Sequence, residues 1–110
     1  MTREEFIETY QLEDKCMILE PWEDFKGGIV GVTEDHTSII YSYQGMVESL
    51  ARAYEKEYYE QHKDEEYDTD RFSEFLDEAV EWIDYNTLRD LPYRDTNYRP
   101  IIMIETDLEI

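Results

Sequence analysis

The sequence predicts one small α+β domain with a three-stranded, mainly antiparallel sheet and helices packed on one face of it. Three observations lead to this prediction. The chain has 110 residues, 41% of them hydrophobic and 15% aromatic, which is enough for one modest core. Apolar residues recur with helical spacing in three segments and form strand-like runs in three others. These segments follow the order α-β-β-α-α-β, which is typical of a single acidic α+β domain over residues 1–110.

The first segment has the features of a helix start. Thr2 and Glu5 have the spacing of a capping box, in which each side chain accepts a hydrogen bond from the other residue's backbone N–H. We therefore expect a helix over about residues 3–10. Its short apolar stripe consists of Phe6, Ile7 and Tyr10.

Residues 16–19 form an apolar run that Pro21 ends. This run fits a short strand or a buried loop, and the sequence does not separate the two. Trp22 and Phe25 follow, three residues apart, in an acidic turn. We expect both aromatic rings to fold back onto the core.

The clearest strand pair spans residues 29–32 and 38–43, which are joined by a polar connection of hairpin length. Gly31 lies inside the first of these strands. A glycine at such a position predicts a β-bulge or the close approach of a packed helix. Residues 44–45 are expected to end the hairpin.

A helix is predicted over about residues 45–62, because apolar residues recur there at helical spacing. Residues 63–68 form a charged connector without apolar anchors. Thr69 or Asp70 is expected to cap the helix that follows. The apolar stripe of the predicted helix consists of Met46, Val47, Leu50, Ala51, Tyr54 and Tyr58.

The helix that begins near Asp70 is the most strongly patterned part of the chain, with an apolar stripe on one side and an acidic opposite side. Pro92 ends it, because proline lacks a backbone N–H. Residues 101–104 then form a buried strand that joins the hairpin. The apolar stripe consists of Phe72, Phe75, Leu76, Ala79, Val80 and Ile83, and the acidic side of Glu74, Asp77, Glu78, Glu81 and Asp84.

The net charge of the chain is −19, from 29 acidic and 10 basic residues. Such a field repels nucleic acid and anionic membranes and attracts basic proteins, so we expect no direct binding of nucleic acid and no membrane association. The one cysteine, Cys16, excludes an internal disulfide and fits a reducing cytoplasm. A charged segment follows Met1, and apolar runs do not exceed four residues, so we expect neither a signal peptide nor a membrane span.

Patterns for metal binding and catalysis are weak. Residues 64–70 alternate carboxylates as a calcium loop does, but the sixth and twelfth positions of that loop lack the required glycine and glutamate. Cys16, His36 and His62 share no zinc-ligand spacing, and a cysteine in an apolar run fits a buried hydrophobe better than a nucleophile. We expect no metal, no cofactor and no enzymatic activity. The least favoured alternative is an enzyme that uses carboxylates and a divalent cation.

Acidic residues concentrate between Glu48 and Asp84, where the chain has 14 acids and four bases. Rows of carboxylates can imitate a phosphate backbone and occupy a groove meant for nucleic acid. On charge alone a solubilising face is the simpler interpretation, but interleaved tyrosines are typical of interfaces. The predicted partner-binding residues are Glu55, Glu57, Tyr59, Glu60, Asp64, Glu65, Glu66, Tyr67, Asp68 and Glu74.

A local exception to the acidity lies at residues 89–99, which hold Arg89, Arg94 and Arg99 among tyrosines. This pattern is compatible with an arginine–tyrosine binding loop. We favour pairing of the arginines with carboxylates of their own chain, since the acidic excess offers many partners.

Residues 81–93 read EWIDYNTLRDLPY and are followed by PIIM at residues 100–103. Together with the GIVGV and IIYSY segments of the hairpin, this signature resembles a set of short hypothetical proteins encoded by phages and prophages of gut Firmicutes. The resemblance covers about residues 27–104. It implies a phage accessory protein that acts inside a bacterium, and it transfers no activity and no site residues. Side chains of the signature expected to pack where the helix turns toward the last strand are Tyr85, Leu88, Leu91 and Tyr93.

These features predict a non-enzymatic phage protein that inhibits a host nucleic-acid-binding defence protein, such as a CRISPR effector or a nuclease. It would compete with nucleic acid for a basic groove, as an anti-CRISPR that acts as a DNA mimic does. The alternative is a structural or adaptor module of a phage without an inhibitory role. In that alternative, apolar residues near the hairpin edge, such as Ile39 and Tyr41, mediate docking or self-association. The sequence sets no oligomeric state.

Overall fold

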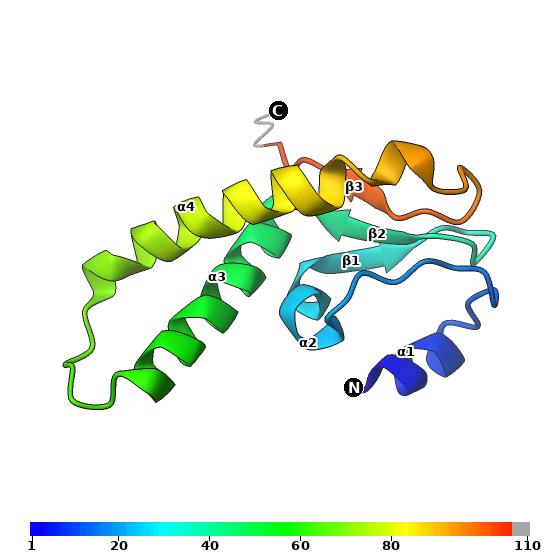
Figure 1. Ribbon diagram of the computed structural model, residues 1–110. Helices are drawn as coiled ribbons and strands as arrows, with labels where there is room; N and C mark the ends of the chain where they lie inside the picture. The colour runs from blue at the N-terminus through cyan, green and yellow to red at the C-terminus, as the bar shows by residue number, and fades with distance from the viewer. Residues whose placement is uncertain (107–110) are drawn as a thin grey trace.

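The computed structural model describes residues 1–106 and confirms the α+β class. Figure 1 shows a small sheet body with α1 and α2 beside it, and a helical hairpin of α3 and α4 that extends away from it. The elements of the described range are α1 (Arg3–Thr9), α2 (Trp22–Phe25), β1 (Ile29–Val32), β2 (Ile39–Ser42), α3 (Tyr43–Gln61), α4 (Phe72–Trp82) and β3 (Ile101–Met103). They are linked by the 3-10 turns η1 (Lys26–Gly28), η2 (Thr69–Arg71) and η4 (Leu91–Tyr93), and by the π-helical segment η3 (Ile83–Leu88).

The sheet of the described range has the strand order β1-β2-β3. β1 and β2 form the predicted antiparallel hairpin, in which Val32 pairs with Ile39. β3 joins this hairpin as predicted, and it runs parallel to β2, with Ile40 opposite Ile101. The sheet is therefore mixed, because the two helices between β2 and β3 return the chain to the end of the sheet where β2 began.

β1 contains the bulge that Gly31 predicts. The register shifts between Ile29, which lies opposite Tyr41, and Gly31, which lies opposite Ile40. Val30 is the extra residue, and it is 52% exposed. The bulge therefore leaves an apolar side chain open to solvent at the edge of the sheet.

The helices cover one face of the sheet, as predicted, and the core lies between them and β2. Ile39 and Tyr41 of β2 are fully buried in this core. Ile101 and Met103 of β3 are exposed, so the expectation of a buried last strand is wrong, because no helix of the described range covers that face of β3. The Tyr41 hydroxyl accepts a hydrogen bond from the backbone N–H of Leu19 at 3.1 Å, and burial raises the pKa of Tyr41 to about 12. The expectation that Ile39 and Tyr41 are available for docking is wrong, because their own chain encloses both side chains.

Of the two alternatives for residues 16–19, the structure has the buried loop. Ile18 is buried in the core. The backbone N–H of Met17 donates to the carbonyl oxygen of Tyr98 at 3.0 Å, which ties this loop to the segment before β3. The acidic turn that follows is the short helix α2, and its Phe25 is buried in the core as expected.

α3 begins directly after β2, so the expectation that residues 44–45 end the hairpin is wrong. The side chain of Ser42 accepts a hydrogen bond from the backbone N–H of Gly45 at 3.0 Å and caps the helix. The start of α3 lies against η1, where a Cβ atom on Gly28 would come within 2.8 Å of the backbone nitrogen of Met46. Gly28 and Gly45 therefore allow two backbone segments to cross in direct contact.

α4 begins after a cap that differs from the predicted one. The side chain of Asp68, rather than Thr69 or Asp70, caps η2, and it accepts a hydrogen bond from the backbone N–H of Asp70 at 3.0 Å. η2 leads directly into α4, which has the predicted apolar stripe. The most buried residues of this stripe and its extension into η3 are Phe75, Ala79 and Ile83.

Beyond Trp82 the helix continues as the π-helical η3, in which Asn86 donates a hydrogen bond from Nδ2 to the carbonyl oxygen of Trp82 at 3.0 Å. The turn η4, which contains Pro92, ends the helical run as expected. Tyr85 is exposed and Tyr93 is 88% exposed. Their expected packing role is wrong, because both rings face solvent beside the turn.

Candidate functional site

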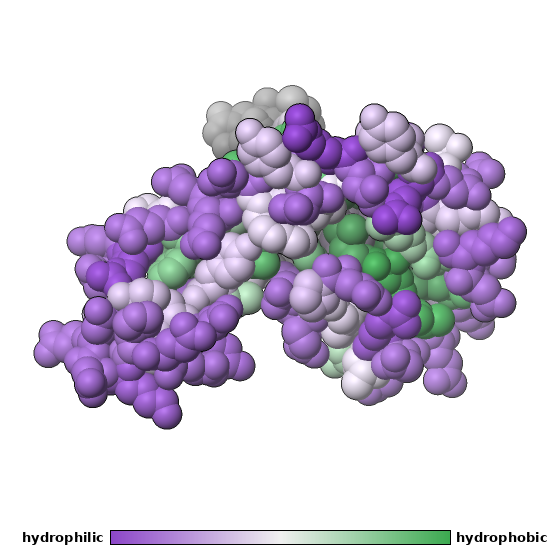
Figure 2. Space-filling view, in the orientation of Figure 1, coloured by the Kyte–Doolittle hydropathy of each residue, from purple (hydrophilic) through white to green (hydrophobic). Residues whose placement is uncertain are grey.

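The predicted partner-binding residues lie on the hairpin of α3 and α4. The two helices pack against each other, and Leu50 and Ala51 of α3 share one apolar cluster with Phe75 and Ala79 of α4. This packing turns the charged residues outward. Figure 2 shows a strongly hydrophilic surface over the free end of the hairpin, at the left of the view. Residues 62–71, which connect the helices at that end, are called the hairpin tip below.

A charged cluster closes the hairpin tip. The Tyr58 hydroxyl and the Arg71 guanidinium both bond to the carboxylate of Glu65, Arg71 at 3.1 Å, and Arg71 also contacts the Tyr58 hydroxyl. His62 stacks on the Tyr58 ring with a centroid distance of 4.2 Å. The hydrogen bond from Tyr58 and the charge of Arg71 hold the pKa of Glu65 below its usual value. Glu65 therefore stabilises the tip.

The two tyrosines predicted as interface anchors also organise the tip. The Tyr67 hydroxyl donates to the carboxylate of Glu55 at 3.2 Å, and the Tyr59 hydroxyl accepts from the backbone N–H of Asp68 at 3.1 Å. The two tyrosine rings lie 5.4 Å apart between centroids. The expectation of a connector without apolar anchors is wrong, because Tyr67 packs on Tyr59. Tyr67 is still 60% exposed, so it also contributes surface.

The remaining predicted carboxylates on α3 and the tip are exposed. Glu57 and Glu60 belong to the last turns of α3, and Asp64 and Glu66 belong to the tip. In the part of the chain that the structure describes, none of these four forms an ion pair. The predicted set therefore divides into carboxylates that hold the hairpin together and carboxylates that face solvent.

The most regular row of carboxylates lies on α4. Glu74, Asp77, Glu78 and Glu81 repeat at the helical spacing, all four are exposed, and none forms an ion pair within residues 1–106. α4 itself contains no lysine or arginine. These four residues are called the α4 ridge below. The predicted site included Glu74 alone, although the spacing of the other three in the sequence already indicated the row.

The charge density of the α4 ridge is close to that of one DNA strand. Its four carboxylates fall within the eight residues of helix from Glu74 to Glu81, whose seven steps span about 10–11 Å of axis at the α-helical rise. One strand of duplex DNA carries a phosphate about every 3.4 Å of axis, so the same length holds about three phosphates. A basic groove shaped for a phosphodiester backbone therefore finds a similar line of negative charge on α4.

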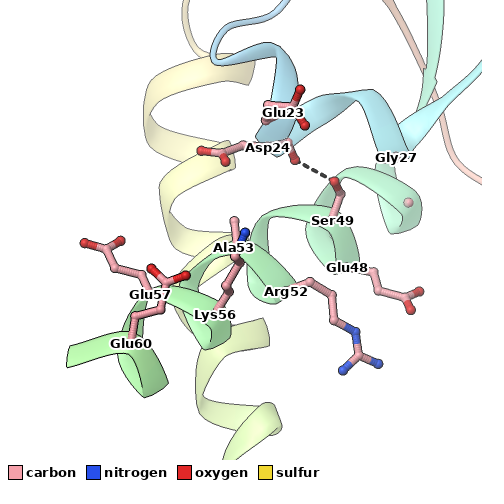
Figure 3. Close-up of a pocket in the computed structure, with 11 residues that line it drawn as sticks. Glu23, Asp24, Gly27, Glu48, Ser49, Arg52, Ala53, Lys56, Glu57 and Glu60 are labelled. Carbon is pink, nitrogen blue, oxygen red and sulfur yellow. Dashed lines mark hydrogen bonds between the residues drawn. The ribbon is translucent and has the colours of Figure 1, made fainter. Parts of the chain in front are cut away.

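The outer surface of α3 is different, because basic residues interrupt its carboxylates. Arg52 and Lys56 lie four residues apart on α3, about one helical turn, and therefore share one side of the helix, whereas Lys63 belongs to the hairpin tip. Figure 3 shows Glu57 and Glu60 on one side of the helix and Arg52 on the other. Arg52 is paired with Glu55 at 3.3 Å. The acids of the two helices therefore do not form one uniform face, and the uninterrupted row is that of α4.

Residues of α2, η1 and α3 line a charged cleft of about 680 Å³ (Figure 3). The Ser49 hydroxyl donates to the backbone carbonyl of Asp24 at 2.6 Å and holds α2 on α3. Burial and the nearby carboxylates of Glu57 and Glu23 raise the pKa of Asp24. The cleft also contains Lys56, so its charges are mixed, and Ser49 is engaged by the backbone rather than by a base.

The candidate catalytic residues lie in separate environments. Burial raises the pKa of the Cys16 thiol, which favours the unreactive protonated form. His36 bonds to the backbone carbonyl of Tyr10 at 2.8 Å, and His62 stacks on Tyr58 at the opposite end of the fold. Over the described range, no group of three or more His, Cys, Asp or Glu side chains is arranged to hold a metal ion.

The arginines of residues 89–99 make contacts within their own chain, but within residues 1–106 only Arg94 has the expected carboxylate partner. Arg94 pairs with Asp90 at 2.7 Å. Arg99 donates from Nη1 to the carbonyl oxygen of Leu91 at 3.2 Å, and Arg89 lies over the ring of Tyr85. These contacts are local and stabilise the turn itself, whereas hydrogen bonds from Met17 and Ser38 to backbone carbonyls of Tyr98 and Asn97 attach it to the fold.

Comparisons of the chain with protein-family models, with curated proteins and with solved structures return no match. No helix among the residues described combines the length and the apolar character that crossing a bilayer requires. The fold and the site therefore define an acidic α+β domain with a projecting helical hairpin, and its function is inferred from the arrangement of its charges.

Proposed function

We propose that this chain is a non-enzymatic inhibitor that occupies the basic groove of a host nucleic-acid-binding defence protein, in place of the nucleic acid. The observation that carries the proposal is the α4 ridge, an exposed line of four carboxylates with the linear charge density of a phosphodiester strand. Lysine and arginine side chains that bind phosphates also bind carboxylates at this spacing.

The net charge of −19 supports the same mechanism. A strongly negative surface accelerates encounter with a basic groove, and the gain falls as salt screens the charges. The chain competes with nucleic acid because both present rows of negative charge to the same cations. The complex is therefore expected to weaken steeply as the salt concentration rises.

The residues of the site have different roles in the proposed binding. The α4 ridge supplies the main row of carboxylates, and Asp64 and Glu66 extend the negative surface to the hairpin tip. The exposed part of Tyr67 provides aromatic contact area beside them. The other residues act indirectly, since their hydrogen bonds keep the hairpin tip in one conformation. These residues are Glu55, Tyr59, Glu65 and Asp68.

The proposed setting is the cytoplasm of a bacterial host, where the chain would act as a phage accessory protein. Its support is the resemblance of residues 81–93 and 100–103 to short phage and prophage proteins of gut Firmicutes. A single cysteine with a raised pKa fits a reducing compartment.

The test is an affinity capture from the heparin-binding fraction of a bacterial lysate, with the full chain immobilised and duplex DNA as the eluting competitor. The ridge variant carries E74Q, D77N, E78Q and E81Q. The matched control carries E4Q, E13Q, D14N and E20Q, which also removes four exposed carboxylates. We expect the wild type and the control to capture a protein that duplex DNA releases. The ridge variant should bind this protein at least about tenfold more weakly.

Two outcomes would contradict the proposal. One is equal affinity of the captured protein for the wild type and the ridge variant. The other is affinity that does not change between low and high salt, because ion pairing across the interface requires such a change.

A structural or adaptor role without inhibition is the second candidate function. The observation in its favour is the uncovered face of the sheet, where Ile101 and Met103 are exposed. An adaptor that docks through this apolar face would bind its partner equally well when the α4 ridge is neutralised. The same pair of variants therefore separates the two candidates.

A further inference from the structure

An apolar groove lies between α1 and the edge strand β1. Figure 1 shows these two elements on the side of the fold away from the hairpin of α3 and α4. In the described sheet, β1 pairs with β2 on one side, and its other edge borders this groove. The groove has a volume of about 480 Å³. Its walls include Phe6 and Tyr10 of α1, Trp22 of α2, and Val30 and Val32 of β1.

The walls of this groove, called the β1 groove below, are mainly aromatic and aliphatic. The Phe6 ring lies 4.8 Å from the Tyr10 ring and 5.4 Å from the Trp22 ring between centroids. Tyr10 is 43% exposed and Val30 is more than half exposed. The buried indole N–H of Trp22 has no hydrogen-bond acceptor among the residues described.

The β1 groove is formed without a partner, because α1 is tied to the β1–β2 connection. His36 Nδ1 and the Tyr10 carbonyl oxygen form a hydrogen bond of 2.8 Å, and the backbone N–H of Glu13 donates to the carbonyl oxygen of His36 at 3.0 Å. Both bonds link the end of α1 to the β1–β2 connection. A ligand therefore meets a preorganised wall and loses little binding free energy to ordering it.

Charges of both signs border the β1 groove. Lys26 lines it and is paired with Glu23 at 2.7 Å, and the exposed acids lie toward the β1–β2 connection and on α1. Glu34 and Asp35 follow β1 directly and are exposed, and α1 presents Glu5 and Glu8 to solvent. Hydrogen bonds from Thr37 and Thr33 hold the pKa of Asp35 below its usual value, so this carboxylate is charged at neutral pH. Lysine or arginine residues in a ligand are favoured at these positions.

We propose that the β1 groove binds an extended basic peptide segment of a partner protein, which adds to the sheet as a strand beside β1. The unpaired backbone edge of β1 provides hydrogen bonds to the peptide backbone, as in other cases of strand addition. One apolar side chain of the peptide packs against Phe6 and Trp22, and its Lys or Arg residues lie beside Glu34 and Asp35. A second copy of this chain is disfavoured in the groove, since two chains of −19 repel each other.

The α4 ridge and the β1 groove are separate surfaces, so this inference goes beyond the proposed function. A single partner can contact both, or each can serve a different partner. The experiment below uses the groove alone, and its outcome does not depend on whether α4 inhibits a nucleic-acid-binding protein.

The test selects short random peptides from a display library on the full chain. Val30→Lys places a charge at the edge of β1, and Met103→Lys, the matched control, places one at the edge of β3, where Met103 is also exposed. We expect selected peptides to alternate apolar residues and to carry Lys or Arg at one end. Their affinity should fall at least about tenfold for V30K and remain within about twofold for M103K.

A second readout does not depend on the folding of a groove variant. The chain has two tryptophans, and Trp82→Phe leaves Trp22 as the sole tryptophan. Binding of a selected peptide to this variant should change the emission of Trp22, because the partly exposed ring loses contact with water.

Three results would overturn the proposal. The first is a library that yields no common pattern, and the second is binding that leaves Trp22 emission unchanged. The third is self-association of the wild type in sedimentation experiments that V30K abolishes, which would make a second copy the occupant. A ridge variant that still binds the selected peptides would show that the groove works independently of α4.

Discussion

Tyr41 and Tyr43 lie two residues apart, yet their hydroxyls occupy opposite environments. The Tyr41 hydroxyl accepts the backbone N–H of Leu19 inside the core, whereas the Tyr43 hydroxyl donates to the exposed carboxylate of Asp84 at 3.0 Å. We expect Tyr41→Phe to lower the free energy of unfolding by about 1–3 kcal/mol, because the buried N–H of Leu19 loses its acceptor. Urea unfolding followed by circular dichroism measures the change.

Tyr43→Phe is the matched control, since it also removes one hydroxyl. Its expected effect on the free energy of unfolding is within about 0.5 kcal/mol, because water replaces the lost partner at an exposed site. Equal effects of the two substitutions would contradict the role assigned to Tyr41. An absorbance titration gives an independent check, since Tyr41 in the folded protein should ionise with a pKa of about 12.

At the hairpin tip, the sequence indicated which tyrosines and carboxylates are important, but it did not indicate their hydrogen-bond partners. Tyr59 and Tyr67 read as interface anchors because tyrosines among acids are typical of interfaces. In the structure their hydroxyls bond to Asp68 and Glu55. These contacts depend on how the connector folds back along α3, and no local spacing encodes that path. Only the tertiary contacts therefore distinguish the residues that face solvent from the residues that stabilise the hairpin tip.

At the scale of elements, the crossing of η1 and α3 depends on two glycines. A Cβ atom on Gly28 would come within 2.8 Å of the backbone nitrogen of Met46, and a backbone atom cannot move aside as a flexible side chain does. We expect Gly28→Ala to destabilise the fold by about 1–3 kcal/mol through overpacking. Thermal unfolding followed by circular dichroism gives the comparison with the wild type.

Gly31→Ala is the control for this prediction. Within the described structure, no atom lies within 4 Å of a Cβ atom on Gly31 apart from its chain neighbours. The substitution should therefore leave the stability within about 0.5 kcal/mol of the wild type. If both substitutions lower the stability equally, the loss of stability would come from replacing any glycine rather than from the contact between η1 and α3.

Helices with a clear hydrophobic period could be predicted from the sequence. The boundaries of the elements and the direction of the last strand were harder to predict. The stripe and the acidic side of α4 follow from the 3.6-residue period, which also predicted the residues of the α4 ridge. The start of α3 was missed because Ser42 both ends β2 and caps the helix. The direction of β3 was not expected, because an apolar run of three residues reads the same whether its neighbour is parallel or antiparallel.

At the scale of the whole molecule, negative charge works against the compact state. Only four ion pairs occur within residues 1–106, and all involve partly exposed side chains, so they offset little of the repulsion. We expect the melting temperature to rise with sodium chloride, because salt screens repulsion among the excess acids. For a domain of this size, each kcal/mol of relief raises the melting temperature by roughly 4–8 °C.

Calorimetric scans at low and high salt, with the wild type, the ridge variant and its matched control, test this prediction. The ridge variant should melt at a higher temperature than the wild type at low salt and should respond less to salt. The dispersed control should show a smaller gain. A melting temperature that falls as salt is added would mean that ion pairs, rather than repulsion, dominate the electrostatic free energy.

The total charge was known from composition, but its distribution required the fold. Counting acids from residue 48 to residue 84 suggested that both helices contribute alike. Packing instead gives α4 an uninterrupted row, while Arg52 and Lys56 divide the acids of α3. The β1 groove was not predictable at all, since Phe6, Trp22 and Val30 come together from three separate elements.

The parallel pairing of β3 with β2 has a consequence for the order in which the chain folds. β1 and β2 are neighbours in sequence and can pair as soon as both have left the ribosome. Ile101 meets Ile40 only after the intervening helices have closed the distance between them, and loop-closure entropy makes such a distant contact slow. The last strand is therefore added to a hairpin that already exists, and its absence would leave one edge of β2 open during synthesis.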